Sequence, residues 1–412
     1  METLHPREVE LGLARVGRVG KRLFTGPPPF RVVTVAGTNG KGSTVAMLEV
    51  VLQRAGYRTG AYTSPHLLRY NERVRIGGRE AGDAALCRAF EQVEAARGDI
   101  SLSYFEFGTL AAIQMFREAG VQVAILEVGL GGRLDAVNIL DPDVAVVSSI
   151  GIDHTEWLGG TREDIGREKA GIFRAGRPAV CADPEPPASI AAQARAVGAR
   201  LYQLGRDFHV ETQDPGWTWR FHDRVRSGLP HPLLRGEEQL CNAAAVLTVL
   251  HILAPDFPVA PQHIRDGLSA VDLPGRFQVL PGAPVCVLDV AHNPQAVARL
   301  RLKLMQQAVA GRTLALAGML RDKALVENLR LLADRVDAWF FTALPAGRGA
   351  GGAELMAAAR EAGITAPMKA YEEPLLAWRA LQAEARPDDR MLVFGSFYLV
   401  GDILRAHQQG TP

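Results

Sequence analysis

The sequence has few cysteines, no excess of charge of either sign and no long apolar run, and each lack excludes a class of protein. Four cysteines are scattered through 412 residues without a C-x-x-C pair. This pattern argues against a disulfide framework or a zinc site and predicts reduced thiols in a cytosol. Lysine and arginine total 46 against 45 acidic residues, a net charge of +1. We therefore expect neither a general nucleic-acid binder nor a membrane-surface binder.

Targeting and membrane signals are also missing. No apolar run approaches the length of a membrane span, and the first residues carry charges where a signal peptide needs an apolar core. We therefore expect a cytoplasmic protein. The apolar content of 47% and charged content of 22% are those of a globular chain, and 412 residues exceed one ordinary core, so two domains are expected.

A glycine-rich turn links a β-branched run at 32–35 to a helical pattern that ends near Leu52. The turn contains Thr38, Asn39, Gly40, Lys41, Gly42 and Ser43. Its glycines let backbone N–H groups close around phosphate oxygens, the helix start favours anions, and the lysine adds a mobile positive charge. Although Gly42 is inserted into the usual spelling, we predict a nucleoside-triphosphate site rather than a turn without a chemical role.

The residues after this turn alternate between strand and helix patterns, which predicts an α/β fold. A short helical lead is expected at 4–23, before the turn. Strands are expected at 59–62, 73–76, 121–128, 144–149, 179–181, 200–203, 208–211 and 217–221. Helices are expected from a Ser103/Glu106 capping box to about 119, from Thr161 to Gly171, and at 240–253 and 261–271. These elements predict an N-terminal P-loop ATPase-like domain with a mostly parallel sheet.

A second unit begins after a hinge-like segment at 273–276. Strands are expected at 285–289, 313–317, 338–342 and 391–394, and helices near 295–309, 324–334, 353–362 and 374–385. We predict a smaller C-terminal, Rossmann-like α/β domain, with domain limits of 1–273 and 274–412.

Polar side chains follow several strands at the edge where open parallel sheets bind ligands. Ser64, Glu127, Asp153 and His154 are predicted there. A hydroxyl, a carboxylate and an imidazole beside a triphosphate could form a magnesium shell, although Mg²⁺ prefers oxygen ligands. Glu127 could instead be a charge at a frayed strand end, and His154 a hydrogen-bonded loop histidine. Lys169 by itself is most simply a lysine that faces a helix C-terminus.

The second domain has a similar cluster. The run 289–294, D-V-A-H-N-P, stands at a strand end, and its proline is placed to begin the next helix. Arg276 in the hinge could reach a phosphate, or it could be a solvated linker charge.

Eight motifs together resemble the folylpolyglutamate synthases of the Mur ligase superfamily, in that family's order and over nearly the whole chain. They are G-T-N-G-K-G-S (37–43), T-S-P-H-L (63–67), E-V-G-L-G-G-R-L-D-A (127–136), D-H (153–154), E-K-A-G-I (168–172), L-P-G-R-F (273–277), D-V-A-H-N-P (289–294) and G-S-F (395–397). The segment 98–106 is similar to that of the bifunctional bacterial members, the dihydrofolate synthase/folylpolyglutamate synthases.

The resemblance implies a set of ATP and metal ligands. The phosphate loop would hold the β- and γ-phosphates, and Asn242, Arg276 and Asp289 would contact ATP. Ser64, Glu127, His154 and a carbamylated Lys169 would ligate magnesium. A pair of Mg²⁺ ions is expected, with room for a monovalent cation.

The resemblance also implies two acceptor sites. Pteroate would be bound by Val9, Glu10, Leu11, Gly12, Ser103, Tyr104, Phe105, Glu106, Leu134, Asp135 and Ala136. His292 and Ser396 would lie near the incoming glutamate. ATP would phosphorylate the carboxylate of dihydropteroate or a reduced folate, and the amine of L-glutamate would attack the acyl phosphate. Lys41, Lys169 and His292 are the expected catalytic residues.

Other functions remain open. One alternative is a P-loop kinase that stops at phosphoryl transfer, and another is a nucleotide sensor without catalysis. Within the superfamily, the alternatives are a monofunctional folylpolyglutamate synthase and a cell-wall amino-acid ligase. We expect a monomer with no nucleic-acid or membrane partner.

Overall fold

The computed structural model of the chain describes residues 10–213, 215–234, 236–345 and 347–409. The chain divides into two compact units. The first holds the described residues through Gly151 together with Thr155–Leu233 and Glu237–Asp272. The second holds Ile152–His154, Leu234, Gly236 and the chain from Leu273 onward.

A mostly parallel sheet forms the centre of the first unit. Its strands are β1 (Arg31–Ala36), β2 (Thr59–Tyr62), β3 (Val74–Ile76), β4 (Arg79–Glu80), β5 (Val123–Glu127), β6 (Val144–Val147), β7 (Pro178–Cys181) and β8 (Arg200–Gln203). Their order is β4-β3-β2-β5-β1-β6-β7-β8. Among these described strands β3 is antiparallel to both of its neighbours, β2 and β4, and the other neighbouring strands pair parallel. Because Val35 pairs with Glu127 and Ala36 with Val147, β1, β5 and β6 end at one edge.

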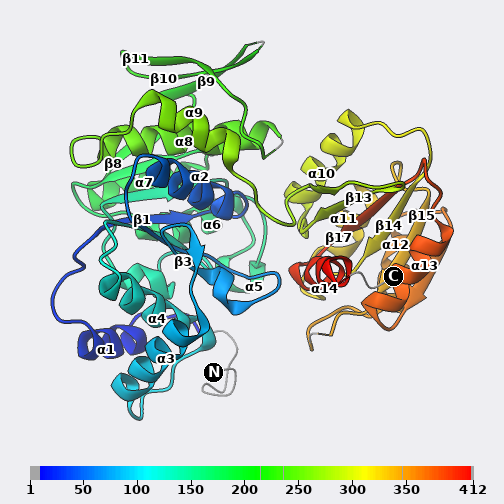
Figure 1. Cartoon of the computed structure of the whole chain (residues 1–412), viewed down its shortest axis with the longest axis horizontal. Coiled ribbons are helices and arrows are strands. Elements are labelled where there is room, and N and C mark those ends of the chain that lie inside the picture. Colours follow the sequence, from blue (N-terminus) through cyan, green and yellow to red (C-terminus); the bar gives the residue numbers. More distant parts are fainter. Residues whose placement is uncertain (1–9, 214, 235, 346, 410–412) are drawn as a thin grey trace. The chain divides into compact units, whose positions relative to one another are not determined.

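Helices cover both faces of this sheet (Figure 1). They are α1 (Ala14–Leu23), α2 (Lys41–Arg54), α3 (Asp83–Arg97), α4 (Tyr104–Glu118), α5 (Thr155–Leu158), α6 (Arg162–Lys169), α7 (Ala188–Val197), α8 (Glu237–Leu253) and α9 (Pro261–Ala270). Helices α1, α3 and α4 pack together on one face, and α2, α8 and α9 on the other. A small antiparallel sheet of β9 (Phe208–Gln213), β10 (Gly216–Phe221) and β11 (Arg224–Leu229) covers α8.

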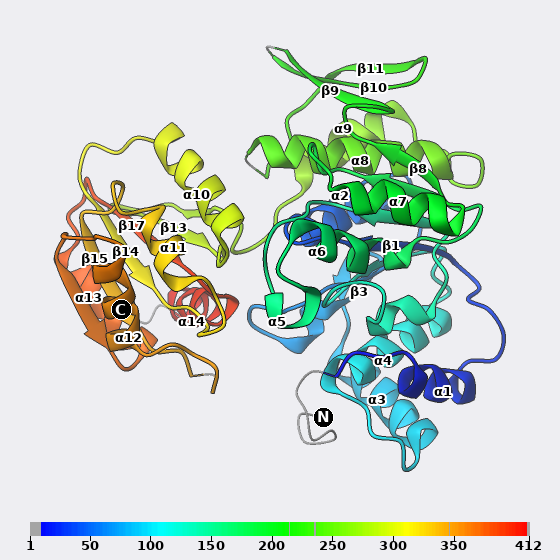
Figure 2. The ribbon, with the colours of Figure 1, turned by 180° about the vertical axis from the view of Figure 1, so that it is seen from behind.

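The second unit is a separate α/β layer structure. Its strands, in the spatial order β12-β13-β17-β14-β15-β16, are β12 (Gln278–Leu280), β13 (Val285–Asp289), β17 (Arg390–Phe394), β14 (Thr313–Ala317), β15 (Ala338–Thr342) and β16 (Met368–Tyr371). Helices α10 (Pro294–Gln306), α11 (Leu325–Arg330) and α12 (Gly352–Glu361) lie on the face toward the viewer in Figure 2. Helices α13 (Pro374–Glu384) and α14 (Phe397–Gln408) pack together on the other face.

The α/β class and the parallel sheets are confirmed, but several elements differ from the prediction. The expected helical lead at 4–23 begins only at Ala14, and residues 4–9 lie outside the described residues. Within 10–13 the chain is not helical, because the backbone N–H of Gly12 donates to the carbonyl of Leu134, 3.2 Å away. The sequence did not predict the edge strands β12 and β16 or the helices α3, α7 and α14. Edge strands are only half covered, so their apolar pattern is weak.

Among the helices of the described residues, none combines the length and the apolar character needed to cross a bilayer.

Candidate active site

The phosphate loop lies between β1 and α2, as predicted. Lys41 is the first residue of α2, and Gly40 before it has a φ of 86°, a left-handed conformation that favours glycine. The Lys41 ammonium donates to the carbonyls of Gly37 at 3.0 Å and Thr38 at 3.2 Å. The cation therefore lies over the loop, at the N-terminus of a helix that itself favours anions.

Residues that directly follow the neighbouring strand β6 hold the loop in place. Thr38 donates its backbone N–H to the Ser149 carbonyl at 2.6 Å, and its hydroxyl exchanges bonds with the backbone of Gly151 at 3.0 Å. The hydroxyls of Ser148 and Ser149 donate to the Asn39 carbonyl at 2.7 and 3.0 Å. Sequence reasoning did not identify these two serines. In the sequence they are simply two hydroxyl-bearing residues after an apolar strand. Their contact with the phosphate loop could be inferred only once β6 was known to pair with β1.

Asn242 on α8 supports the loop from another side. It is 4% exposed, and a Cβ added to Gly40 would lie 2.8 Å from its Oδ1 and 2.9 Å from its Nδ2. Its Nδ2 donates to Gln239 Oε1 at 3.2 Å. Asn242, the predicted ATP contact, therefore lies directly against the phosphate loop, and glycine is the only residue that fits opposite it.

Glu127 is a buried carboxylate at the end of β5, 5% exposed. Its Oε2 accepts the backbone N–H of Ser64 at 3.2 Å, and it lies 3.8 Å from where a Cβ on Gly42 would stand. Thus two predicted metal ligands meet beside the phosphate loop. A buried carboxylate and a hydroxyl-bearing residue are the oxygen donors that suit Mg²⁺, so these residues fit a divalent cation.

Lys169 is the last residue of α6 and is only 3% exposed. Gly132 passes so close that an added Cβ would lie 2.9 Å from the Lys169 carbonyl. Among the described residues no three His, Cys, Asp or Glu side chains are grouped as a metal site. Of the four predicted metal ligands, only Glu127 and His154 belong to these residue types, so a group of three was not expected among them. The metal site therefore remains a prediction.

The structure brings three of the predicted pteroate segments together in the first unit. Gly12 N–H donates to the Leu134 carbonyl, which joins the segments 10–12 and 134–136. Arg15 pairs with Glu10 and also lies 3.2 Å from Glu106, which ties the first segment to the start of α4. Leu11 is half-buried within this group, whereas Val9 lies outside the described residues.

The start of α4 is the predicted capping box. The Ser103 hydroxyl accepts from the backbone N–H of Glu106 at 3.3 Å, and the Glu106 carboxylate accepts from the backbone N–H of Ser103 at 2.7 Å. Phe105 is half-buried, with its ring 5.7 Å from that of Tyr62 and in contact with Gly129. Its position beside the glycine loop leaves both a packing role and a ligand role open.

A cationic residue missed by sequence reasoning stands beside these aromatics. The guanidinium of Arg73 lies 5.1 Å from the ring centre of Tyr104 and 5.4 Å from that of Tyr70. Its Nε donates to His66 Nδ1 at 2.8 Å. Arg73 and Arg15 were missed because the partners that place them at the start of α4, Tyr104 and Glu106, are far away in the sequence.

Asp135 is the most perturbed acid among the predicted pteroate residues. Burial raises its pKa to about 7, although the backbone N–H groups of Leu130 and Val137 donate to its two oxygens at 2.9 and 3.0 Å. Both carboxyl oxygens are therefore engaged by the backbone of the glycine loop, so Asp135 fixes the shape of the segment 130–137.

In the second unit, His154 has a φ of 51°, an uncommon left-handed conformation for a residue other than glycine. The neighbouring Asp153 accepts from Lys323 Nζ at 2.8 Å and from Asn293 Nδ2 at 3.1 Å. His292 Nε2 lies 3.7 Å from the same carboxylate. Burial opposes ionisation, but the hydrogen bond from His292 and the nearby cations hold the pKa of Asp153 well below its usual range.

The remaining predicted residues of this unit have visible structural roles. Asp289 at the end of β13 accepts the backbone N–H groups of Phe277 and Ala291 at 2.9 and 2.8 Å, and burial raises its pKa. Arg276 lies with its guanidinium 5.1 Å from the ring centre of Phe397. Ser396 caps α14 by accepting the backbone N–H of Leu399 at 3.0 Å.

Known proteins share this arrangement. The Mur ligase middle domain matches residues 35–214, and the Mur ligase glutamate ligase domain matches residues 275–397. The dihydrofolate synthase/folylpolyglutamate synthase of Escherichia coli is 45% identical over 98% of this chain and 93% of its own length. That of Haemophilus influenzae is 38% identical over 98% of this chain and 94% of its own length.

Solved structures agree with these matches. Escherichia coli FolC in complex with DHPP and ADP superposes with a TM-score of 0.93 at 44% identity, covering 100% of this chain and 96% of that one. A bifunctional folylpolyglutamate synthase/dihydrofolate synthase with Mn, AMPPNP and L-glutamate bound has a TM-score of 0.89 at 46% identity, covering 99% and 96%.

The phosphate loop, the two α/β units and these matches define a Mur ligase, a class of ATP-dependent amide-bond-forming enzymes. Within that class, the chain belongs to the dihydrofolate synthase/folylpolyglutamate synthase family.

Proposed function

We propose that this enzyme adds L-glutamate to dihydropteroate, making dihydrofolate, and to the γ-carboxylate of reduced folates, making folylpolyglutamates. The observation that supports this proposal is that three segments, 10–12, 103–106 and 134–136, come together in the unit that also contains the phosphate loop. The relatives are named for both activities, and one is solved with DHPP. We further propose domain limits of 1–273 and 274–412, a monomer, and a cytoplasmic location, the last because the four cysteines, all of them described residues, form no disulfide bond.

The test is ADP release with three acceptors: dihydropteroate, tetrahydrofolate and a muramyl precursor. Release with the first two and not the third is expected, together with a new amide in the product. Release without an amide would point to the P-loop kinase alternative. Release with the muramyl precursor alone would point to a cell-wall ligase.

Phosphate activation is assigned to the first unit. The loop 38–43 would hold the β- and γ-phosphates, and Lys41 would place a positive charge on the group in transfer. Asn242 keeps the loop in position through its contact with Gly40. The acceptor carboxylate attacks the γ-phosphorus and ADP leaves, so the product of this step is an acyl phosphate.

Amide formation is assigned to residues of the second unit. The neutral amine of glutamate attacks the acyl carbon, phosphate leaves, and the amine gives up a proton. His292 donates its Nδ1 proton to the Val290 carbonyl at 2.8 Å, and its Nε2 faces the Asp153 carboxylate at 3.7 Å. Held in this way by two neighbours, the ring would orient the glutamate through the Nε2 edge. Ser396 would contact the same substrate, while Arg276 and Asp289 would contact ATP.

A divalent cation would be held by Ser64, Glu127, His154 and Lys169, and we propose a pair of Mg²⁺ ions with a monovalent cation. A relative solved with Mn and AMPPNP supports a divalent ion. When bound, such an ion would neutralise charge on the phosphates. For Lys169 to contribute a ligand, its unprotonated amine would attack the carbon of CO₂ and release a proton, leaving an anionic carbamate.

Glu127→Gln and His154→Ala should raise the magnesium concentration needed for half-maximal rate by about 10–100-fold each, because a metal ligand is lost. Glutamine keeps the acceptor for the Ser64 N–H, so the fold should survive. The measurement is a magnesium titration at saturating ATP, with Glu118→Gln on the exposed face of α4 as control. Superimposable titration curves for both variants and the control would refute the metal assignment.

Phe105→Ala should raise the KM for dihydropteroate by about tenfold while the KM for ATP stays unchanged, because an aromatic face suits a flat pterin ring. Phe107→Ala on the same helix is the matched control, since Phe107 is 2% exposed and belongs to the core. That control should lose about 3–5 kcal/mol of stability and lower both activities together. If Phe105→Ala behaves like Phe107→Ala in thermal unfolding and kinetics, Phe105 is a core residue.

A further inference from the structure

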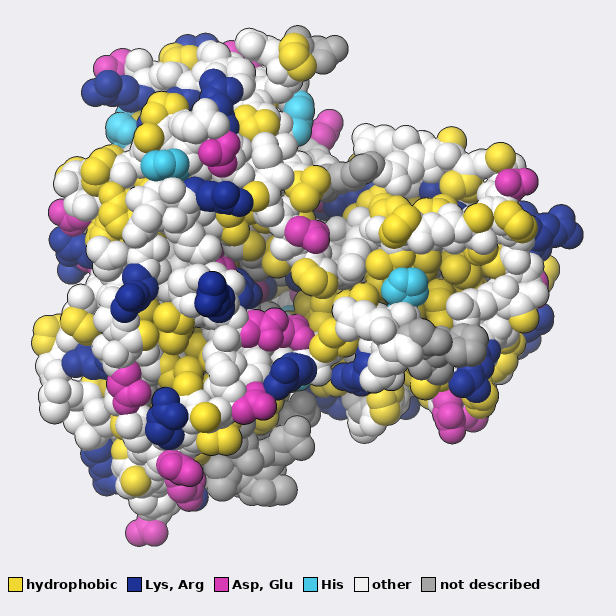
Figure 3. All heavy atoms as spheres, viewed as in Figure 1, with side chains coloured by type: hydrophobic (Ala, Val, Ile, Leu, Met, Phe, Trp, Pro, Cys, Tyr) yellow, Lys and Arg dark blue, Asp and Glu magenta, His cyan; other side chains and the backbone are white. Residues whose placement is uncertain are grey.

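The first unit contains a cavity between β11, α8 and α9, away from the phosphate loop. It has a volume of about 430 Å³, within the range of small-molecule sites. Its basic side chains are those of Arg224, Arg226, Arg265 and His251, and no Asp or Glu lines it among the described residues. Apolar side chains, Leu229 among them, complete the wall. In Figure 3, Lys, Arg and His side chains lie around the three-stranded sheet at the top.

Strand pairing explains how the arginines reach the cavity. In the antiparallel pair of β10 and β11, Trp219 is opposite Arg226 and Phe221 is opposite Arg224. Directly opposed residues point to the same face of a sheet. That face lies on α8, since the Trp219 indole donates to Thr248 at 3.2 Å. The two arginines therefore project toward α8 from the exposed edge strand.

His251 stands opposite them in the last turn of α8. Its ring lies 5.1 Å from that of Phe221 and 6.1 Å from that of Trp219. Burial, and then the charges of Arg224 and Arg226, lower its pKa. The guanidinium groups of Arg224 and Arg226 are therefore close enough to act on the His251 ring, and all three side chains line the same cavity.

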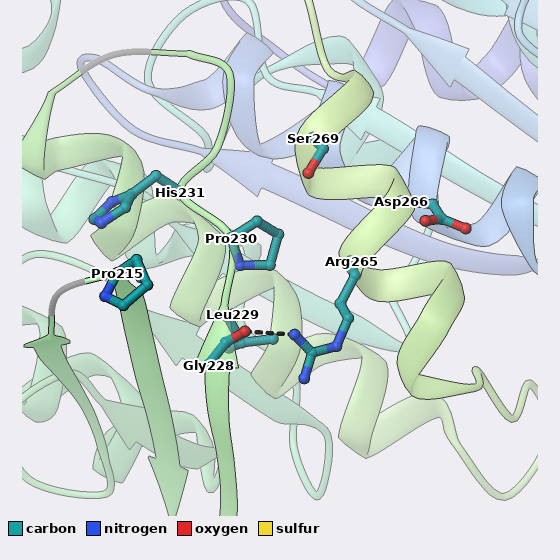
Figure 4. A pocket seen from close by; sticks show the side chains of 9 residues that line it. Pro215, Gly228, Leu229, Pro230, His231, Arg265, Asp266 and Ser269 are labelled. Atoms are coloured by element: carbon teal, nitrogen blue, oxygen red, sulfur yellow. Dashed lines mark hydrogen bonds between the residues drawn. The ribbon is translucent and has the colours of Figure 1, made fainter.

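Arg265 completes the lining from α9. Its guanidinium donates to the carbonyls of Gly228 and Ser227, which fixes β11 to α9. Figure 4 shows this bond in an adjoining cavity of about 460 Å³, which, unlike the first, has a carboxylate, Asp266, in its lining. Arg265 therefore lies between a cavity whose charged side chains are all arginines and one that also contains a carboxylate. The first residue of α9, Pro261, also lines the cationic cavity, so the positive end of that helix adds to its potential.

No carboxylate among the described residues pairs with the arginines of this cavity. The side chains of Arg224 and Arg226 make no hydrogen bond or ion pair with another described residue. Burial lowers the pKa of Arg226, and no compensating carboxylate opposes it. Asp223, in the turn before β11, is the acid that acts on His251, and it does not line the cavity. The side chain of Arg226 is partly buried, whereas those of Arg224 and Arg265 are exposed. A partly buried guanidinium group without a counter-charge costs free energy unless a ligand supplies the anion.

We propose that the cavity lined by Arg224, Arg226, Arg265 and His251 binds a small organic anion with two or more negative charges. Planar guanidinium groups match the oxygens of phosphate and carboxylate groups, often through two parallel hydrogen bonds. The apolar wall accommodates a short carbon skeleton beside the anionic groups. This site is separate from the phosphate loop, and the proposal does not depend on the proposed function.

The test is isothermal titration calorimetry of the full chain with inorganic pyrophosphate and, separately, with citrate. Nucleotide is omitted because ADP is itself a multivalent organic anion, and magnesium is omitted because it would chelate both probes. Binding of a probe at the phosphate loop is recognised because the arginine variants of the cavity leave it unchanged. We expect saturable binding of at least one probe. The Arg224→Gln/Arg226→Gln double variant should weaken it by about tenfold or more, since two charge-assisted hydrogen bonds are lost. The probe that binds more tightly identifies the anion as phosphate-like or carboxylate-like.

Arg220→Gln is the matched control. Arg220 lies on β10 but pairs opposite Val225, so it points to the other face of the sheet, where it contacts Glu211 at 3.1 Å. Its loss should leave binding within about twofold, the range of exposed ion pairs. Should the double variant fail to fold, Arg226→Gln alone replaces it. The proposal is overturned if neither probe binds the wild-type chain saturably, or if the arginine variants bind as well as Arg220→Gln.

Discussion

Lys41→Ala should lower the rate of ATP-dependent glutamate addition by about three orders of magnitude, because one preorganised charge on a transferring group is typically worth that much. Lys41 opens α2 and lies over the loop carbonyls of Gly37 and Thr38. Among the described residues of the loop 37–43 it is the only cationic side chain. The measurement is steady-state ADP release with dihydropteroate as acceptor.

The matched control for this variant is Arg54→Ala, at the exposed far end of the same helix. It removes a cation from α2 without touching the loop, so activity should stay within about twofold of the wild type. Circular dichroism and thermal unfolding confirm that both variants are folded. A Lys41→Ala enzyme that is folded and retains more than a small fraction of wild-type ADP release would show that the loop is not the phosphate site.

Lys169→Ala should lose at least about 100-fold in rate, because we assign the residue as a carbamate ligand of the metal. Its side chain is almost fully buried at the end of α6, so little else can fill its place. Added formate or acetate should restore part of the activity, since a free carboxylate can occupy the position of the carbamate. Activity is measured across a carboxylate titration at fixed magnesium.

Two controls make the rescue specific. Arg167→Ala removes an exposed cation from the same helix, one that forms an ion pair with Asp164 three residues away, and should change the rate little. Lys41→Ala also lacks a lysine but should gain nothing from carboxylates, because its role is a positive charge. If formate fails to rescue Lys169→Ala, or rescues both lysine variants alike, the carbamate assignment is wrong.

The parts of the fold that could be predicted have local causes. The phosphate loop needs only a strand, glycines and a helix start, and all of these lie within about twenty residues. The capping box of Ser103 and Glu106 spans one helical turn, and the structure shows both of its hydrogen bonds. The parallel sheets follow from alternating apolar strands and helices, whose order in the chain already restricts the topology.

The parts that could not be predicted depend on distant partners. The helix at the N-terminus starts at Ala14 because Gly12 bonds to Leu134, more than a hundred residues away. Arg15 and Arg73 become candidate site residues only when their partners Glu106 and Tyr104 are in place. Ser148 and Ser149 could have been suspected only from the pairing of β6 with β1. The anion cavity depends on β11, a strand whose exposed, arginine-rich pattern does not resemble a core element.

Because Gly40 and Asn242 are in close contact, the residue at one of these positions limits which residues can stand at the other. A side chain at 40 would collide with the amide of 242, some two hundred residues along the chain, at less than 3 Å. A library that randomises the phosphate loop alone should therefore return glycine at position 40 in nearly every active clone. A smaller residue at 242 would remove the collision, but the left-handed backbone at position 40, with its φ of 86°, would still favour glycine. Glycine at position 40 is therefore required both by its neighbour and by its own backbone conformation.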